Sequence, residues 1–334
     1  GKVDPADGLE EAQRDEGING LRHRWRKLTT GRASEQSSTP RPAPARACVA
    51  RWQRRVSDSN SEQLAHVLID LVSRTLVGGA LVGLAAARTH RRRQLTLGGA
   101  YAAFALGTAA VVGGIGWAGA LAAFFYSATL VGGWRERDKR QRSYSVLPDG
   151  RTRDAWQVLA NGGLFAVAAV IWGFDGSWEA GLFGFGALAT ATADTWATEI
   201  GMALDAAPRS ITTWKRVTPG TSGGVSAFGT AAVVGGSFLI ALLAVATFTT
   251  PFDIPRLEAV FVGGLAGAAT DSLLGASLQS RRWCEQCGAW TERRVHICGY
   301  RSHHREGFRW MTNDVVNLLA TAVGGAVAVG AWHP

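Results

Sequence analysis

The chain has 334 residues, of which 47% are hydrophobic and only 18% are charged, and it contains 42 glycines. This composition, with its apolar residues gathered in long runs, is not that of an ordinary soluble protein. The net charge of +9 could indicate nucleic-acid binding, but the basic residues gather in particular loops. That placement indicates membrane topology, and we expect no nucleic-acid partner.

Residues 1–63 differ in composition from the rest of the chain. They are rich in charged residues, Ser and Pro, and they show little apolar periodicity. Such a segment cannot bury enough apolar surface to offset the entropy lost on folding. We therefore predict a disordered or weakly structured N-terminal extension.

Apolar runs dominate residues 64–333, and each is near the ~20 residues that cross a bilayer as a helix. The runs are 64–87, 95–112, 117–133, 158–173, 180–203, 226–248, 258–279 and 313–332. The alternation of a membrane β-barrel is absent. The sequence predicts an all-α polytopic membrane protein with seven or eight transmembrane helices. Whether 64–87 spans fully stays open, because His66, Asp70 and Arg74 interrupt it.

Basic residues follow alternate apolar runs, whereas the intervening loops at 113–117, 174–179 and 249–257 carry almost none. The basic clusters are Arg88, Arg91, Arg92 and Arg93; Arg135, Arg137, Lys139, Arg140 and Arg142; Arg209, Lys215 and Arg216; and Arg281, Arg282, Arg293 and Arg294. Positive charge is enriched in cytoplasmic loops of membrane proteins. We expect these loops to face the cytoplasm.

The sequence also contains an apparent internal repeat. ALGTAAVVGG (105–114) recurs as AFGTAAVVGG (227–236), and RDAWQVLANGG (153–163) resembles NDVVNLLATAVGG (313–325). An even number of crossings separates the copies, so the two halves would be parallel. Chance similarity in an Ala-, Gly- and Val-rich background is the alternative.

Two carboxylates lie inside apolar runs: Asp194 in 187–201 and Asp271 in 263–277. A charged side chain near the centre of a membrane helix costs roughly 2.5–3.5 kcal/mol on insertion scales, so it marks a candidate functional site. A hydroxyl follows each acid directly, at Thr195 and Ser272. A structural polar contact between helices is the plainer interpretation.

The segment 194–224 combines acids, bases and glycines. Thr198 shares a helix face with Asp194, whereas Glu199 lies about 140° around the helix. Lys215 and Arg216 follow in the loop 208–226. A turn rich in glycine comes next, and its backbone amides can approach an anion just before a helix N-terminus: Gly220, Thr221, Gly223 and Gly224. Acids for a divalent cation, fixed positive charge and such a turn are typical of phosphate-handling sites.

The segment 280–312 contains three cysteines and several histidines within a predicted cytoplasmic loop. Cys284, Cys287 and Cys298 with His303 would complete a tetrahedral zinc site of structural type. A reduced pair of cysteines without metal and a disulfide are alternatives, although a cytoplasmic location disfavours a disulfide.

Five ordered motifs resemble the integral membrane family called domain of unknown function 92. They are DAWQVLANGG (154–163), ATADTWATEIG (191–201), PGTSGGVS (219–226), ATDS (269–272) and NDVVNLLA (313–320). That family includes the plant and cyanobacterial phytyl-phosphate kinase. The resemblance implies transfer of a phosphoryl group from a nucleoside triphosphate, with CTP preferred, to an isoprenyl monophosphate at the bilayer.

From the positions of these motifs and the charged residues near them we infer roles for particular residues. Asp194 and Asp271 would hold Mg²⁺, and Glu199 and Lys215 would join them as catalytic residues. The residues expected to bind substrate or nucleotide are Asp154, Asn161, Thr195, Thr198, Arg216, Gly220, Thr221, Gly223, Gly224, Ser272, Asp314 and Asn317.

Two other functions fit parts of the same pattern. A secondary transporter would explain the repeat and the intramembrane acids, and it predicts access to the acids from both sides. A lipid cytidylyltransferase would use the same site residues to transfer a nucleotidyl group instead.

Overall fold

The computed structural model describes residues 72–143, 152–204, 207–248, 254–292 and 294–332. The predicted extension over residues 1–63 lies outside these ranges. The described long helices are 72–91, α3 (Leu97–Gly113), α4 (Ile115–Gly133), α6 (Ala155–Asp175), α7 (Trp178–Ala203), α8 (Ala227–Phe248), α9 (Ile254–Ser277) and α10 (Asn313–Ala331). A short helix, α5 (Glu136–Ser143), follows α4. These helices correspond one for one to the predicted apolar runs.

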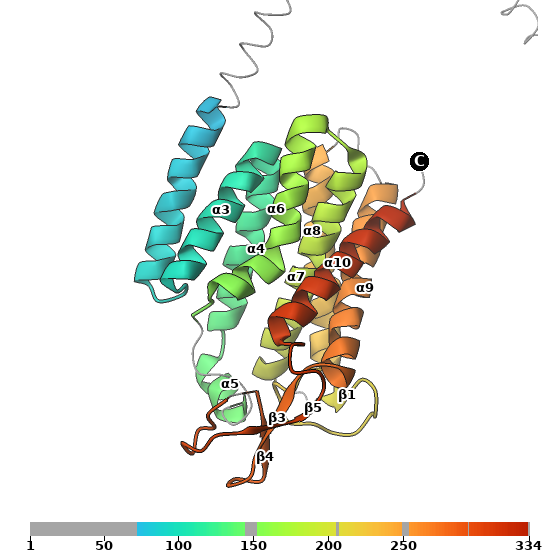
Figure 1. The fold of residues 1–334 in the computed structure, drawn as a ribbon. Coiled ribbons are helices and arrows are strands. Elements are labelled where there is room, and N and C mark those ends of the chain that lie inside the picture. The colour runs from blue at the N-terminus through green and yellow to red at the C-terminus, as the bar shows by residue number, and fades with distance from the viewer. Residues whose placement is uncertain (1–71, 144–151, 205–206, 249–253, 293, 333–334) are drawn as a thin grey trace, which may run out of the picture. The chain divides into compact units, whose positions relative to one another are not determined.

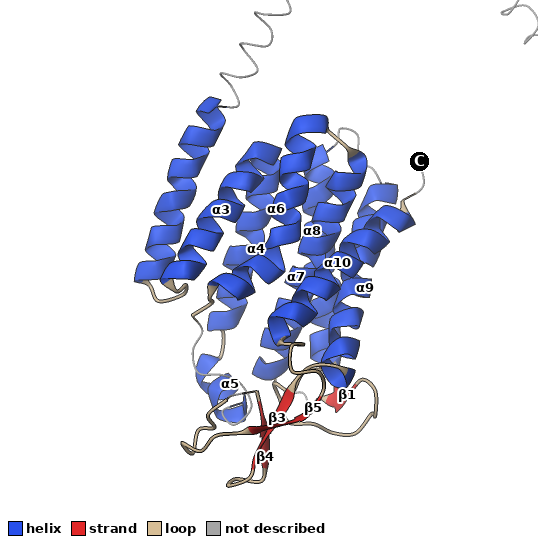
Figure 2. Ribbon diagram, in the orientation of Figure 1, coloured by secondary structure: helices blue, strands red, loops and turns tan. Residues whose placement is uncertain are grey.

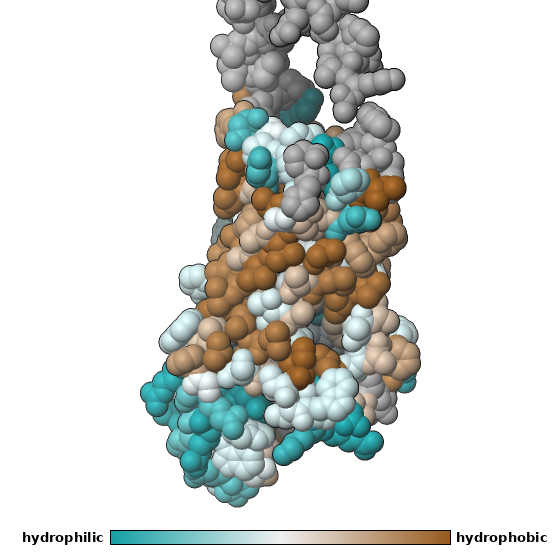
Figure 3. All heavy atoms as spheres, turned by 90° about the vertical axis from the view of Figure 1, so that its right-hand side faces the viewer, coloured by the Kyte–Doolittle hydropathy of each residue, from teal (hydrophilic) through white to brown (hydrophobic). Residues whose placement is uncertain are grey.

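Five of the described helices are long and apolar enough to cross a membrane: α4, α6, α8, α9 and α10. The helix α3 is apolar but shorter. On the face shown in Figure 3, hydrophobic side chains form a broad belt, with hydrophilic residues below it and others above it. The prediction of a helical polytopic membrane protein is confirmed.

Consecutive long helices run in opposite directions, so alternate connections meet at the same end of the bundle (Figure 1). One end carries α5, residues 92–96 and all five strands, and we call it the loop end (Figure 2). The described residues of all four predicted basic clusters belong to segments at this end. The basic loops that alternate along the sequence therefore lie together at one end of the bundle.

The segment 280–312 contains a small antiparallel sheet that the all-α prediction did not include. Its strands are β3 (Arg281–Cys284), β4 (Ala289–Thr291) and β5 (His303–Glu306), in the order β4-β3-β5. A second pair, β1 (Arg209–Ser210) and β2 (Gly224–Val225), closes the connection between α7 and α8.

The helix α7 lies at the centre of the bundle and contacts α6, α8, α9 and α10. Small residues permit this packing: a Cβ atom added to Gly267 of α9 or to Gly324 of α10 would collide with Thr190 of α7. The Thr190 hydroxyl donates to the Gly186 carbonyl one turn earlier, so its polar group is satisfied inside the bundle. Close helix contact through small residues is typical of membrane proteins.

An aromatic cluster fills the part of the core around Trp117, which is fully buried. The Trp117 ring lies 4.8 Å from Phe165 and 4.9 Å from Phe185, measured between ring centroids. Trp172 and Phe248 extend the same cluster. Tilted and edge-on aromatic pairs of this kind bury large apolar areas.

Local sequence signals set the helix boundaries. Thr96, Asp154, Ser177 and Thr312 cap the starts of α3, α6, α7 and α10 by accepting a hydrogen bond from a backbone N–H of the first turn. Gly176 ends α6 in the left-handed conformation, with φ of 66°. These caps fix where the helices begin and end within the predicted runs.

The predicted repeat pairs α3 with α8, α4 with α9 and α6 with α10, and the members of each pair run in the same direction (Figure 1). Their contacts differ, however. The helix α3 packs closely on α6, whereas among the described residues α8 and α10 have little contact, and α10 packs on α9 instead. The duplication therefore stays a prediction.

Candidate functional site

A cavity opens among α7, α8, α9 and the 219–226 turn at the loop end. Its volume is about 150 Å³. Of the predicted site residues, eight line it: Asp194, Thr198, Gly220, Thr221, Gly223, Gly224, Asp271 and Ser272. Residues from three separate motifs thus meet at one place.

The carboxyl groups of Asp194 and Asp271 face each other within hydrogen-bonding reach. Each lies beyond the middle of its helix, towards the loop end. Asn317 of α10 supports the pair: with its amide oriented to satisfy both groups, its nitrogen donates to Asp271 Oδ2 at 2.9 Å and to the Asn313 carbonyl at 3.3 Å. Two anionic groups so close repel each other unless a proton or a cation lies between them.

The glycine turn forms the wall opposite these acids. Gly223 has φ of 75°, and a Cβ atom there would lie 2.5 Å from the Ala276 backbone nitrogen of α9. Glycine therefore lets the turn sit directly against α9. Ser226 follows and caps α8, because its hydroxyl accepts from the Gly229 N–H at 3.1 Å. The N-terminus of α8, with its partial positive charge, borders the cavity at Ser226, Gly229 and Thr230.

A third carboxylate, Glu292, lines the cavity and was not predicted. The Ser222 hydroxyl donates to Glu292 Oε1 at 2.6 Å, and Gln279 Nε2 donates to the same oxygen at 3.0 Å. Burial raises the pKa of Glu292, although the Ser222 hydrogen bond and the nearby Arg281 oppose the rise. No local pattern marks Glu292, because it follows the strand β4 in a segment far from both helices.

The two predicted basic residues do not reach this cavity. Lys215 and Arg216 are exposed on the loop between β1 and β2, and neither lines the wall. Within the described part of the chain, no Lys or Arg side chain lines the cavity. The wall thus presents three carboxylates, hydroxyls and backbone amides, and an anionic ligand there would need a bound cation.

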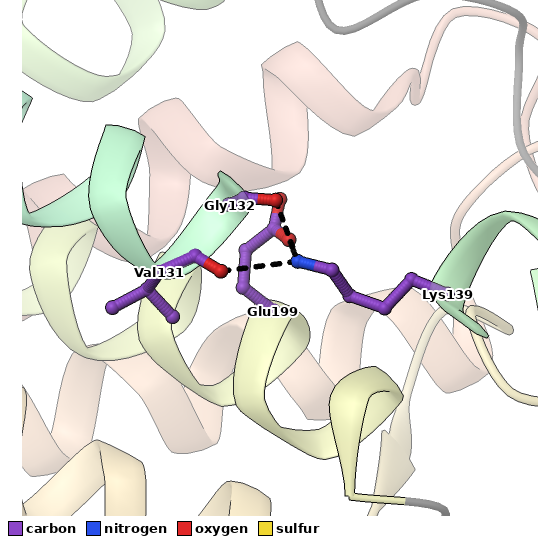
Figure 4. A network of polar contacts seen from close by, with 4 residues as sticks. All are labelled: Val131, Gly132, Lys139 and Glu199. Carbon is purple, nitrogen blue, oxygen red and sulfur yellow. Dashed lines mark hydrogen bonds and ion pairs between the residues drawn. The ribbon is translucent and has the colours of Figure 1, made fainter. Parts of the chain in front are cut away.

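Glu199, predicted as catalytic, faces a different partner (Figure 4). Lys139 of α5 donates to Glu199 and also to the backbone carbonyls of Val131 and Gly132, at 3.1 and 2.8 Å. Because α7 is unbroken from Trp178 to Ala203, the 140° between Asp194 and Glu199 is kept. Glu199 therefore anchors α5 and the C-terminus of α4, and it does not line the cavity.

The remaining predicted residues lie near the loop end without lining the cavity: Asp154, Asn161, Thr195 and Asp314. Asp154 caps α6, where its carboxylate accepts from the Gln157 N–H at 3.0 Å. It lies close enough to Asp314 of α10 for their charges to interact. Asp154 and Asp314 thus lie at the starts of two neighbouring helices, outside the cavity.

The cysteines of 280–312 come together, but with a different histidine from the one predicted. The ligand atoms of Cys284, Cys287, His296 and Cys298 all lie within 4.8 Å of one another. His303 is outside this group, because it lies on β5 and pairs with Trp283 of β3. The structure therefore places His296, and not the predicted His303, beside the three cysteines.

The three thiols also influence one another electrostatically. A backbone hydrogen bond at Tyr300, followed by a contact with His296, lowers the pKa of Cys298 to about 6. Hydrogen bonding to Cys298 raises the pKa of Cys287 to about 11. Opposite shifts in neighbouring thiols are typical of a tight cluster.

Comparison with known proteins gives one family and several relatives, three of which are described here. Residues 80–325 match the family described as integral membrane protein DUF92. The chain is 33% identical to Protein PGR of Arabidopsis thaliana over 60% of this chain and 77% of that protein. It is 32% identical to an uncharacterized membrane protein, MJ0933, of Methanocaldococcus jannaschii over 63% and 73%.

The third relative is Protein VTE6, chloroplastic, of Arabidopsis thaliana. The identity is 28% over 70% of this chain and 64% of that protein. No solved structure matches the chain.

Proposed function

Because the chain belongs to the integral membrane family DUF92, we propose that it is a membrane isoprenyl-phosphate kinase. In this reaction a phosphoryl group passes from a nucleoside triphosphate, of which CTP is the expected example, to an isoprenyl monophosphate such as phytyl or geranylgeranyl phosphate. The products are a nucleoside diphosphate and an isoprenyl diphosphate. Similarity to Protein VTE6 is consistent with the activity that the sequence motifs imply.

The facing carboxylates of Asp194 and Asp271 carry this proposal. Carboxylate oxygens are the protein ligands that Mg²⁺ prefers, and nucleotide enzymes often bind it through one or two of them together with substrate phosphates. The pair fits such an ion, since a cation relieves the repulsion between the two groups. When bound, Mg²⁺ supplies the positive charge that the cavity wall lacks.

The rest of the wall suits the phosphates themselves. Backbone amides of the 219–226 turn and the N-terminus of α8 can donate to phosphate oxygens. Thr198, Thr221 and Ser272 add hydroxyl donors. Such groups, fixed before the ligand arrives, stabilise the charge that spreads over the transferring phosphoryl group.

The proposed step needs no strong general base. An oxygen of the isoprenyl phosphate, already ionised at neutral pH, forms a bond to the γ-phosphorus while the bond from that phosphorus to the bridging β–γ oxygen breaks. The bonding electrons leave with the nucleoside diphosphate. The wall residues orient the two phosphates in line and exclude water, which would otherwise accept the phosphoryl group.

Orientation in the membrane is part of the proposal. The described residues of all four basic clusters lie on segments at the loop end, so this end would face the cytoplasm, where nucleoside triphosphates are present. Asp194 and Asp271 would then lie within reach of both the aqueous phase and the inner leaflet.

The cavity favours an enzyme over a transporter. Its wall consists of residues from the loop-end halves of α7, α8 and α9 and from loop-end connections. A transporter that alternates access would need its acids to be reached from the opposite side as well.

A product assay with two positions of label separates the candidates. Purified protein in detergent is incubated with Mg²⁺, geranylgeranyl or phytyl monophosphate, and CTP labelled at either the γ- or the α-phosphorus. Transfer of the γ label to an isoprenyl diphosphate is expected. Transfer of the α label would indicate a cytidylyltransferase, and no labelled lipid with any nucleotide, in folded protein, would rule out both enzymes.

A further inference from the structure

The Cys/His cluster has the dimensions of a tetrahedral metal site. Cys284 Sγ lies 3.6 Å from Cys298 Sγ, and His296 Nδ1 lies 3.2 Å from Cys298 Sγ. With Zn–S bonds of about 2.3 Å and Zn–N bonds of about 2.0 Å, a tetrahedral ion separates its ligand atoms by roughly 3.5–3.8 Å. Those two distances are close to this range, and Cys287 completes a group whose four ligand atoms all lie within 4.8 Å of one another, so small side-chain adjustments would place all four around one ion.

The kind of ligand selects the metal. Three thiolates and one imidazole form a soft, closed donor set that suits Zn²⁺, and a closed set of four protein ligands is typical of structural sites. A disulfide would use only two of the three thiols and would give no reason for His296 to join them. All three cysteines are free in the structure.

The small sheet also needs a cross-link, such as a bound metal ion, to be stable. Its strands have four, three and four residues, and its apolar contacts centre on Trp283 and Trp290, whose rings lie 5.1 Å apart. So small a unit buries too little surface to be stable alone. A metal ion that joins the turn after β3 to the segment before β5 would fix both connections at once.

The ligands lie on both sides of Glu292 in the chain. Cys287 precedes β4 and His296 follows Glu292, so an ion that holds both residues confines the segment between them. Glu292 then reaches the cavity wall, where Ser222 and Gln279 donate to its carboxylate. The cluster itself is outside the cavity.

From this arrangement we infer that Cys284, Cys287, His296 and Cys298 bind one structural Zn²⁺ ion, which positions Glu292 at the cavity wall. The inference does not depend on the proposed phosphoryl transfer. It concerns a metal site and the order of one segment, whatever ligand the cavity binds.

Metal analysis of the purified full chain tests the site. Protein prepared with a reductant and with zinc in the growth medium should contain about one zinc per chain. His296→Ala and Cys298→Ser should lower this content at least tenfold. The matched control His303→Ala removes a histidine of the same segment that is outside the cluster, and this variant should retain the zinc.

A second measurement uses the wild type, so its result does not depend on whether the variants fold. A strong chelator should remove the zinc from folded protein, and Co²⁺ added afterwards should give the thiolate-to-cobalt absorption of a tetrahedral site. Wild-type protein that binds neither ion would overturn the inference. Loss of zinc in His303→Ala with retention in His296→Ala would equally overturn it.

Hydrogen exchange measured by mass spectrometry tests the positioning of Glu292. Removal of zinc should speed amide exchange in peptides covering 281–306 and in the 219–226 turn, which Glu292 contacts through Ser222. Peptides from α6, at the other side of the bundle core, serve as the control and should be unchanged. Unchanged exchange across 281–306 and 219–226 after complete zinc removal would exclude a positioning role.

Discussion

Asp194 of α7 and Asp271 of α9 present their carboxyl groups to each other, within hydrogen-bonding reach, in the wall of the cavity at the loop end. Both residues are half-buried, and their helices pack closely through Gly264 and Gly267 of α9. Two carboxylates held together in such a place cost free energy, because they repel each other and lose hydration. A bound cation is the simplest physical reason for the pair.

Asp194→Asn and Asp271→Asn should each lower turnover at least about 100-fold, because an amide neither neutralises nor binds a divalent cation as a carboxylate does. The labelled-product assay measures this, and size-exclusion profiles in detergent check folding. Asp175→Asn, the same change at the opposite end of the bundle, should leave turnover unchanged. Full activity in both site variants would remove these residues from the mechanism.

Glu199→Gln should lower stability while largely sparing turnover. The change leaves the buried Lys139 ammonium without its carboxylate, at a cost of about 1–3 kcal/mol. The thermal midpoint in detergent should fall by several degrees. Glu258→Gln, which changes an exposed acid of α9, is the control. A loss of turnover as large as that of Asp194→Asn, with an unchanged midpoint, would restore Glu199 as a catalytic residue.

Gly223→Ala should displace the glycine turn from α9. The new Cβ atom would meet the Ala276 backbone, and φ of 75° is unfavourable for alanine, with strain of about 1–3 kcal/mol. The KM for nucleotide should rise more than that for isoprenyl phosphate, if the turn binds nucleotide phosphates. Gly163→Ala adds a methyl group where no atom lies within 4 Å and should change neither constant.

Glu292→Gln should alter how stability depends on pH. Burial raises the folded pKa of Glu292 above its ordinary value of 4.5, so its contribution to stability is fully present below that value. The contribution is lost as pH rises through the folded pKa. The thermal midpoint of the wild type, relative to that of Glu292→Gln, should therefore fall between acid and neutral pH. A difference independent of pH would show that this carboxyl does not titrate abnormally.

Sequence patterns predicted the helices well, because about twenty apolar residues in a row leave the backbone few alternatives in a bilayer. They also identified Asp194 and Asp271, since a carboxylate in such a run is conspicuous. The prediction for Lys215 and Arg216 rested on charge and nearness in sequence. The β1–β2 pairing instead turns that part of the loop outwards.

The residues that the sequence did not reveal depend on contacts between distant segments. Glu292 enters the cavity only because β4 pairs with β3 and brings it beside Ser222 and Gln279. His296 rather than His303 joins the cysteines because β5 holds His303 against Trp283. Lys139 meets Glu199 because α5 folds back beneath α4.

Composition and periodicity alone determined that this chain is a helical membrane protein with acids inside two of its helices, because burial in lipid constrains each helix separately. Only the tertiary structure decided which acids share a cavity, which one binds a lysine and which histidine completes the cluster. Those outcomes depend on the rotation of α7 and on strand register, and neither is specified by residues close together in the chain.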